Sequence, residues 1–161
     1  MIFRNIEKQD NITIAKIIRE SLESKGLGIP GTVYTDPTTD DLHALFQEQN
    51  STYIIAQKDS EILGGCGIYP TKGLPKGHVE LVKLYLDHHA KGKGLGKELM
   101  NKCIQWAREK GFTHIYLETL NELSSAVKLY ESMGFHSLNS PLGDSGHNAC
   151  DIWMIKEIKS N

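Results

Sequence analysis

Apolar residues recur along the chain with two different periods, which separate the expected helices from the expected strands. Spacings of three and four residues, typical of a helix with one buried face, occur in four segments. We expect helices at 10–25, 40–47, 95–110 and 123–133. Asp10 is the expected N-cap of the first, Thr38 or Thr39 that of the second, and Gly111 the left-handed cap that ends the third.

Runs rich in branched apolar residues lie between these segments and predict strands. They occupy 2–6, 52–57, 62–69, 78–86, 115–118, 136–137 and 151–158. The polar turn 58–61 between the second and third runs indicates a hairpin. The resulting order, β-α-α-β-β-β-α-β-α-β-β, has few parallel crossovers. It predicts a mixed α+β, or mixed α/β, architecture in a single domain over 1–161.

Composition narrows the possible partners and compartment. The chain has 161 residues, 39% apolar and 24% charged, with a formal net charge of -2. No basic field is present to hold a phosphate backbone, so we expect no nucleic acid partner. No apolar run reaches the ~20 residues of a membrane helix, and no signal peptide is visible, so we expect no membrane association and a cytoplasmic location. The three cysteines lack metal-ligand spacing, and we expect no metal site.

The most informative segment, HVELVKLYLDHHAKGKGLGKELM, occupies 78–100. An apolar strand is followed by a polar turn, a glycine cluster at 92–96 and an amphipathic helix. Glycines let successive N–H groups converge on a ligand, and the helix start adds unpaired donors and a positive dipole end. The segment lacks the GxxxxGK[ST] and GxGxxG spacings of other phosphate loops. It therefore predicts a cradle for a pyrophosphate, with Lys91, Lys93 and Lys97 adding positive charge.

Two motifs in this order resemble the GNAT superfamily of N-acetyltransferases. The stretch Lys91-Gly92-Lys93-Gly94-Leu95-Gly96 is similar to that family's [Q/R]-x-x-G-x-[G/A] signature, with lysine in the first place. The strand 80–86 is similar to its fourth strand. The stretch 126–135, AVKLYESMGF, resembles its A-x-x-L-Y-E-x-x-G-F segment.

This resemblance implies a fold and a cosubstrate. The fold is a mixed, mostly antiparallel sheet of six to seven strands, splayed between strands 4 and 5 and flanked by about four helices. The cosubstrate is acetyl-CoA. Its pantetheine arm is expected to pair with the backbone of Leu84, Tyr85 and Leu86, and the amides of 92–97 are expected to hold its pyrophosphate. The expected cofactor-binding residues are Leu84, Tyr85, Leu86, Lys91, Gly92, Lys93, Gly94, Leu95, Gly96, Lys97 and, in place of an asparagine found in many relatives, Asn121.

Two side chains are candidates for moving protons during acetyl transfer to an amine. By the same resemblance, Tyr130 is the expected general acid for the departing thiolate, and its alternative is an ordinary packed aromatic. Glu80 is the expected base, acting through a water, and its alternative is a structural carboxylate paired with Lys83 or with a neighbouring strand. Alternation places Glu80 on one face of its strand with Val82, Leu84 and Leu86. No cysteine lies beside a histidine in a way that predicts a nucleophile, so direct attack by the amine is expected.

The acceptor is left open as a primary amine on a small molecule or a protein. Loops 26–40 and 137–149 are expected to select it, and their acidic residues suit a cationic amine. His147 either faces the acceptor or is an ordinary loop residue, and His88 and His89 are expected to be solvated. A homodimer is possible. The alternatives are a non-catalytic module that binds acetyl-CoA and an enzyme that transfers a longer acyl group.

Overall fold

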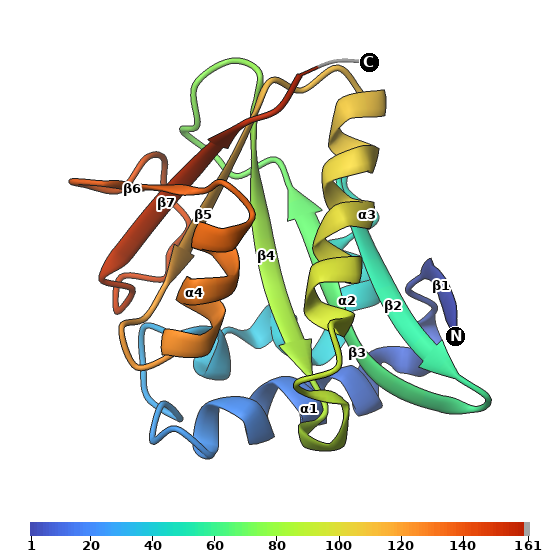
Figure 1. Ribbon diagram of the computed structural model, residues 1–161. Coiled ribbons are helices and arrows are strands. Elements are labelled where there is room, and N and C mark those ends of the chain that lie inside the picture. Colours follow the sequence, from blue (N-terminus) through green and yellow to red (C-terminus); the bar gives the residue numbers. More distant parts are fainter. Residues whose placement is uncertain (160–161) are drawn as a thin grey trace.

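A single seven-stranded sheet forms the centre of the computed structural model, which describes residues 1–159 (Figure 1). Its strand order is β1-β2-β3-β4-β5-β7-β6. All neighbours are antiparallel except β4 and β5, which are parallel. The strands are β1 (Ile2–Asn5), β2 (Thr52–Lys58), β3 (Glu61–Tyr69), β4 (His78–Leu86), β5 (His114–Thr119), β6 (His136–Leu138) and β7 (Ile152–Glu157). The expected mixed, mostly antiparallel sheet is confirmed.

Four α-helices and several short 3-10 turns accompany the sheet. The helices are α1 (Asn11–Glu23), α2 (Leu42–Leu45), α3 (Leu95–Glu109) and α4 (Ser124–Ser132). Asp10 lies at the N-cap position of α1, but its carboxylate accepts hydrogen bonds from Arg4 and the amide of Glu7 instead of from α1. No helix within 1–159 is both long enough and apolar enough to cross a membrane.

The second helix, α2, is shorter than the range 40–47 that its sequence pattern predicts. A 3-10 turn at Pro37–Asp41 precedes the single turn of α2. Asp36 and Asp41 accept the capping hydrogen bonds from Thr38 and Ala44, so the expected threonine caps are wrong. Both aspartates form the short-range side-chain to backbone bond that favours turns over continuous helix.

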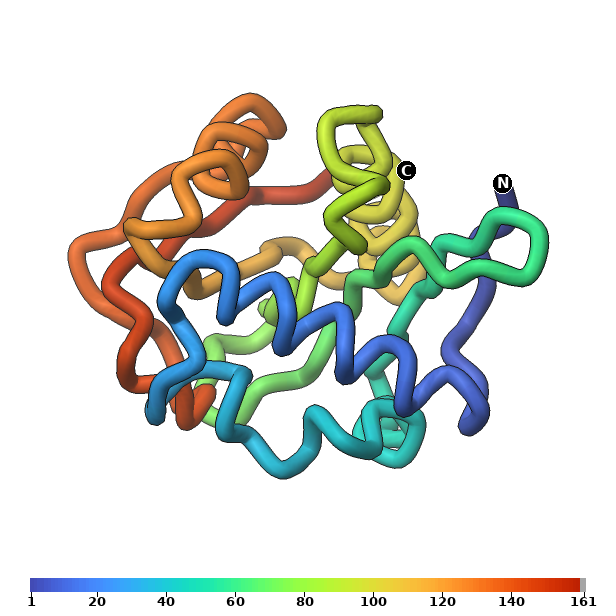
Figure 2. The backbone as a smooth tube through the Cα atoms, turned by 90° about the horizontal axis from the view of Figure 1, so that it is seen from below, coloured from blue at the N-terminus to red at the C-terminus, as the bar shows by residue number. Residues whose placement is uncertain are grey.

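Two apolar cores cover the two faces of the sheet. On one face, α3 and α4 contribute residues such as Leu99 and Tyr130 to a cluster with Val79 and Leu81 of β4. On the other face, α1 and α2 pack around Tyr53 with residues such as Ile18 and Leu42. Figures 1 and 2 both show α1 crossing the end of the sheet toward which β4 runs, with α3 and α4 on either side of β4.

A bulge interrupts β4 at Lys83. Val82 pairs with Gly67 and Tyr85 with Gly65, so Lys83 and Leu84 together face one residue of β3. Lys83 has a φ of 53°, and its carbonyl accepts a 2.8 Å hydrogen bond from the hydroxyl of Tyr53. A bulge shifts the alternation of side chains. Leu84 and Leu86 consequently pack against the α3 core, while Val82 and Tyr85 pack against the α1 core. The expected shared face of Glu80, Val82, Leu84 and Leu86 is wrong.

The sheet opens beside this bulge. β4 pairs with β5 only from His78 to Glu80, opposite His114 to Tyr116. Beyond Glu80 the two strands diverge, and the remaining backbone of β4 pairs with β3 alone among the described residues. The expected splay between the fourth and fifth strands is confirmed, and it leaves one edge of β4 with unpaired polar groups.

Candidate active site

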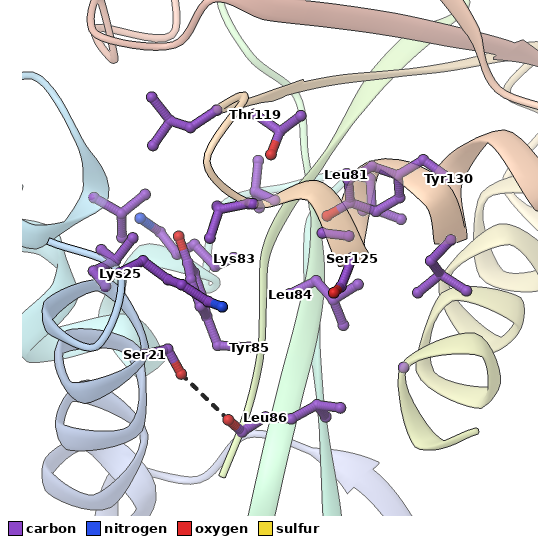
Figure 3. Close-up of a pocket in the computed structure, with 18 of the residues that line it drawn as sticks. Ser21, Lys25, Leu81, Lys83, Leu84, Tyr85, Leu86, Thr119, Ser125 and Tyr130 are labelled. Carbon is purple, nitrogen blue, oxygen red and sulfur yellow. Dashed lines mark hydrogen bonds between the residues drawn. The ribbon is translucent and has the colours of Figure 1, made fainter. Parts of the chain in front are cut away.

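A cavity of about 520 Å³ fills the opening between β4 and β5. Its size is within the range of pockets that bind small molecules and cofactors. Figure 3 shows β4 crossing it, with Ser21 and Lys25 on the α1 side and Ser125 and Tyr130 on the α4 side. The lining includes all of β4 from Glu80 to Leu86 and most of the glycine cluster before α3.

The glycine cluster adopts the conformation that its sequence predicts. Gly92 and Gly94 have φ values of 76° and 79°, in the left-handed region that favours glycine, and Gly94 is the N-cap of α3. A Cβ at either position would meet no atom within 4 Å, so the backbone there is open to a ligand. Lys91 and Lys97 line the cavity, whereas Lys93 is exposed outside its lining. The amides of the first turn of α3 are therefore available to an anion.

The free edge of β4 continues from this cradle into the cavity. Leu84, Tyr85 and Leu86, the three residues expected to pair with a pantetheine arm, all line it. The carbonyl of Leu86 accepts a hydrogen bond from the hydroxyl of Ser21 at 3.2 Å (Figure 3). An extended ligand lying along this edge can add main-chain hydrogen bonds as a further strand does.

Glu80 lies at the point where β4 and β5 separate. Its side chain lines the cavity although only 3% of the residue is exposed. Burial raises the pKa of Glu80 to about 7, against an opposing hydrogen bond of 2.5 Å from Thr71, and the nearby Glu118 raises it further. A carboxyl that titrates near neutral pH can accept a proton from an amine and release it again.

A second carboxylate, which the sequence reasoning missed, lines the same cavity. Glu118 of β5 accepts a 2.6 Å hydrogen bond from the hydroxyl of Tyr116 and another from the hydroxyl of Ser145. The Tyr116 hydroxyl also accepts a bond from the amide of Leu142. These bonds attach the 139–151 loop to β5. The sequence signal that could have identified Glu118 was a charged residue in the otherwise uncharged run 115–118.

Tyr130 enters the cavity from the last turns of α4. It is 7% exposed, and burial raises the pKa of its hydroxyl, with the nearby Cys66 and Tyr85 acting in the same direction. The phenol is therefore protonated across the neutral range. Glu80 and Tyr130, 50 residues apart in sequence, are brought to one cavity by the splayed strands.

A partly buried cluster of Lys83, Asp36 and His147 lies at the cavity wall, to which Lys83 and His147 contribute. The ammonium of Lys83 lies 3.8 Å from Oδ2 of Asp36, and the same oxygen is 2.9 Å from Nε2 of His147. Burial acts to raise the pKa of Asp36, but hydrogen bonds from Thr38 and His147 and the charge of Lys83 outweigh it, and the pKa falls to about 2. Burial lowers the pKa of Lys83. His147 lines the cavity, as one of the two interpretations expected.

Comparison with known proteins identifies the family. The sequence profile of the acetyltransferase (GNAT) family matches residues 15–135. This chain is a member of that family. It is 35% identical over 158 residues to the uncharacterized N-acetyltransferase YjgM of Escherichia coli, with 98% of this chain and 95% of that protein covered. The GNAT domain thus accounts for both motifs noted in the sequence.

Solved structures of GNAT acetyltransferases share the fold. An acetyltransferase of Staphylococcus aureus superimposes with a TM-score of 0.82 at 17% identity, over 98% of this chain and 99% of that one. The PaiA N-acetyltransferase of Thermoplasma acidophilum, solved in complex with coenzyme A, superimposes with a TM-score of 0.76 at 20% identity, over 98% of both chains. The splayed seven-stranded sheet is thus a GNAT fold, and the protein is an acyltransferase.

Two cysteines of this GNAT enzyme lie in different surroundings, one in the core and one at the cavity. Cys103 is buried in the α3 core, where its thiol lies 3.5 Å from the carbonyl of Cys66. Cys150 lines the cavity, but burial raises the pKa of its thiol to about 12. Because the thiolate is the reactive form, this shift disfavours a reactive Cys150 at neutral pH.

Asn121 and the polar turn at 87–89 of the acetyltransferase fall outside the cavity. Asn121 is exposed and absent from the lining, and its backbone amide donates a hydrogen bond to the carboxylate of Asp151. Ser124 and Ser125 of α4, a few residues later, do line the cavity. Asp87, His88 and His89 bring three potential metal ligands within 4.8 Å of one another. Both histidines are exposed, as expected, and Asp87 caps the turn through the amide of His89.

Proposed function

We propose that this protein transfers an acetyl group from acetyl-CoA to a primary amine of a small molecule or a protein, by direct attack of the amine. The observation that supports this most is a single cavity that joins three parts. These are an anion cradle at 92–97, the unpaired edge of β4, and two side chains suited to proton transfer.

In this proposal the backbone binds the cosubstrate. The amides from Gly92 to Lys97 hold the pyrophosphate, and the free edge at Leu84, Tyr85 and Leu86 pairs with the pantetheine arm. Lys91 and Lys97 add charge from the cavity wall, and Lys93 adds it from the exposed side of the loop. Asn121 is exposed and outside the cavity lining, so it would contact only a part of the cosubstrate that extends beyond the cavity.

Two side chains then carry the protons. When bound, acetyl-CoA supplies a thioester carbonyl as the electrophile. Glu80, through a water, accepts the proton that the amine loses, and a pKa of about 7 suits it to do so at neutral pH. The amide of Leu86 polarises the carbonyl oxygen. Tyr130 donates its proton to the departing thiolate and regains it from solvent.

Release of free thiol from acetyl-CoA, measured with a panel of primary amines, tests this function. Tyr130→Phe removes the proton donor but keeps the ring, so we expect kcat to fall by about 10²-fold with unchanged affinity for acetyl-CoA. Tyr69→Phe is the matched control, because Tyr69 does not line the cavity and should leave kcat unchanged. Saturable acetyl-CoA binding without turnover on any amine would instead identify a non-catalytic binding module.

A further inference from the structure

The ammonium of Lys83 is the one buried side-chain nitrogen in the cavity wall that has no hydrogen-bond partner among the described residues. Its side chain is 3% exposed. A lysine ammonium carries three donors, and leaving them unused in a buried position is costly. A ligand that enters the cavity can supply the missing acceptors.

Asp36 forms an ion pair with this ammonium but no hydrogen bond. Its Oδ2 is engaged by His147 at 2.9 Å, and its Oδ1 accepts two hydrogen bonds from the amide and hydroxyl of Thr38. The remaining approach to Lys83, at 3.8 Å, is longer than a hydrogen bond. Asp36 therefore balances part of the charge of Lys83 but leaves its donors free.

The β4 bulge fixes where Lys83 lies. Its carbonyl is held by Tyr53, and its ammonium lies on the α1 side of the cavity next to Asp36. Lys25, which follows α1, lines the cavity from the same side. Figure 3 shows Lys25, Lys83 and Tyr85 together on that side of β4, across from Tyr130. Two cations therefore face the α1 side of the cavity, and two carboxylates, Glu80 and Glu118, line it elsewhere.

We propose that Lys83 binds a carboxylate carried by the acceptor, so that the acceptor is an amino acid or a similar compound with an amine and a carboxylate close together. The carboxylate oxygens would accept hydrogen bonds from the ammonium of Lys83, forming a charge-assisted pair. The amine of the same molecule would face Glu80. This inference rests on the proposed acetyl transfer and narrows its acceptor, in place of the simple cationic amine that the acidic loops suggested.

The test compares matched acceptors that differ only in the carboxylate. Thiol release from acetyl-CoA is measured with free α-amino acids and with their primary amides, over aliphatic, aromatic and basic side chains. Three proteins are used: the wild type, Lys83→Met, which keeps the length of the side chain without its charge, and Lys16→Met. Lys16 is an exposed lysine of α1 outside the cavity lining and serves as the control.

We expect Lys83→Met to lower kcat/KM for the acids by about 10- to 100-fold, the usual effect of losing a hydrogen bond to a charged group. The amides should be nearly unaffected. Amidation also changes the pKa of the amine, so the deciding quantity is the change in the acid-to-amide ratio between variant and wild type. Lys16→Met should leave that ratio unchanged, and all three proteins should bind acetyl-CoA equally.

Inhibition of the wild type gives a second measurement that needs no variant. A carboxylic acid that matches the preferred acceptor but lacks its amine should compete with that acceptor, and the corresponding amide should not. If Lys83→Met slows acids and amides alike, or if acid and amide inhibit equally, the carboxylate site is wrong while acetyl transfer stands. If acetyl-CoA releases no thiol with any amine, the proposed function itself fails.

Discussion

Glu80 and Lys83 lie three residues apart on β4, and burial shifts both toward their neutral forms. A low-dielectric environment disfavours charge, so the pKa of the carboxyl rises to about 7 and the pKa of the ammonium falls. In a structural ion pair, mutual attraction keeps both groups charged. Here each faces a cavity, and the shifts are of the kind found where groups exchange protons or await a charged ligand.

Glu80→Gln should remove a base that works only when ionised. Because the pKa of Glu80 is about 7, the wild-type kcat/KM should rise as pH increases through about 7. The variant should lack this rise, so the ratio of wild type to variant should grow with pH up to about 10²-fold. The measurement is kcat/KM from pH 5.5 to about 9 with one amine. An identical pH profile in the two proteins would assign Glu80 a structural role.

The same substitution should stabilise the folded protein at high pH. The pKa of Glu80 is about 7 when folded and 4.5 when exposed, so the unfolded state releases the proton first and stability is lost as pH rises between these values. The penalty grows from about 1 kcal/mol at pH 5 to about 3 kcal/mol at pH 8. Glu80→Gln lacks this penalty, so denaturant unfolding at pH 5 and pH 8 should show a gain in stability over the wild type that is larger at pH 8. A pH-independent difference would contradict the buried, titrating carboxyl.

At the scale of the element, β4 combines a bulge with a free edge, and neighbouring glycines make the bulge possible. The ring of Tyr53 packs on β3, where a Cβ at Gly65 would come within 2.4 Å of it. Only glycine allows this approach, which brings the Tyr53 hydroxyl to the carbonyl of Lys83. The glycines of β3 thus support the position of Lys83 on the opposite strand.

Tyr53→Phe should weaken this support. It leaves the carbonyl of Lys83 without its buried donor, so the free energy of unfolding should fall by about 1–3 kcal/mol. Denaturant unfolding measures this loss. Tyr69→Phe changes a tyrosine on the same sheet that packs edge-on against Phe46, and its effect should be much smaller. Equal losses in the two variants would show that the Tyr53 bond does not hold the bulge.

The start of α3 provides a second test at this scale. Gly94→Asp places a side chain and a negative charge in the anion cradle at a φ of 79°, and we expect acetyl-CoA affinity to fall by about 100-fold or more, the loss of one or two charge-assisted hydrogen bonds. Calorimetry measures the dissociation constant. Gly111→Asp is the control, because Gly111 has a similar φ of 86° beyond the other end of α3. It carries similar backbone strain and should bind acetyl-CoA normally.

At the scale of the whole molecule, the backbone pairing between the two halves of the sheet is limited to three residue pairs of β4 and β5, and the core on the α3 face supplies the other contacts. Each half has its own antiparallel partners, and α3 and α4 flank β4 on either side (Figure 1). A ligand that lies along the free edge of β4 therefore connects the two halves. Its binding should therefore raise the stability of the whole fold as well as protecting the residues that it contacts.

Acetyl-CoA at 100 times its dissociation constant should stabilise the fold by about 2.7 kcal/mol, a rise of several degrees in Tm. Hydrogen exchange should slow in two segments, 81–86 and 92–97, where unpaired amides gain partners. The outer strands β1 and β2 serve as the internal reference and should change less. Uniform protection, or protection confined to other segments, would place the ligand elsewhere.

The sequence by itself determined the order of elements, the hairpin, the glycine cradle and the family, because these depend on local period, turn chemistry and motifs within about 20 residues. It also singled out Glu80 and Tyr130, but only through resemblance. The tertiary structure decided which face each β4 side chain takes, since the bulge at Lys83 depends on Tyr53 and the glycines of β3. It alone brought Glu118 to the cavity and Asp36 to Lys83 and His147, because contacts between distant segments depend on how the strands diverge, which no local pattern encodes.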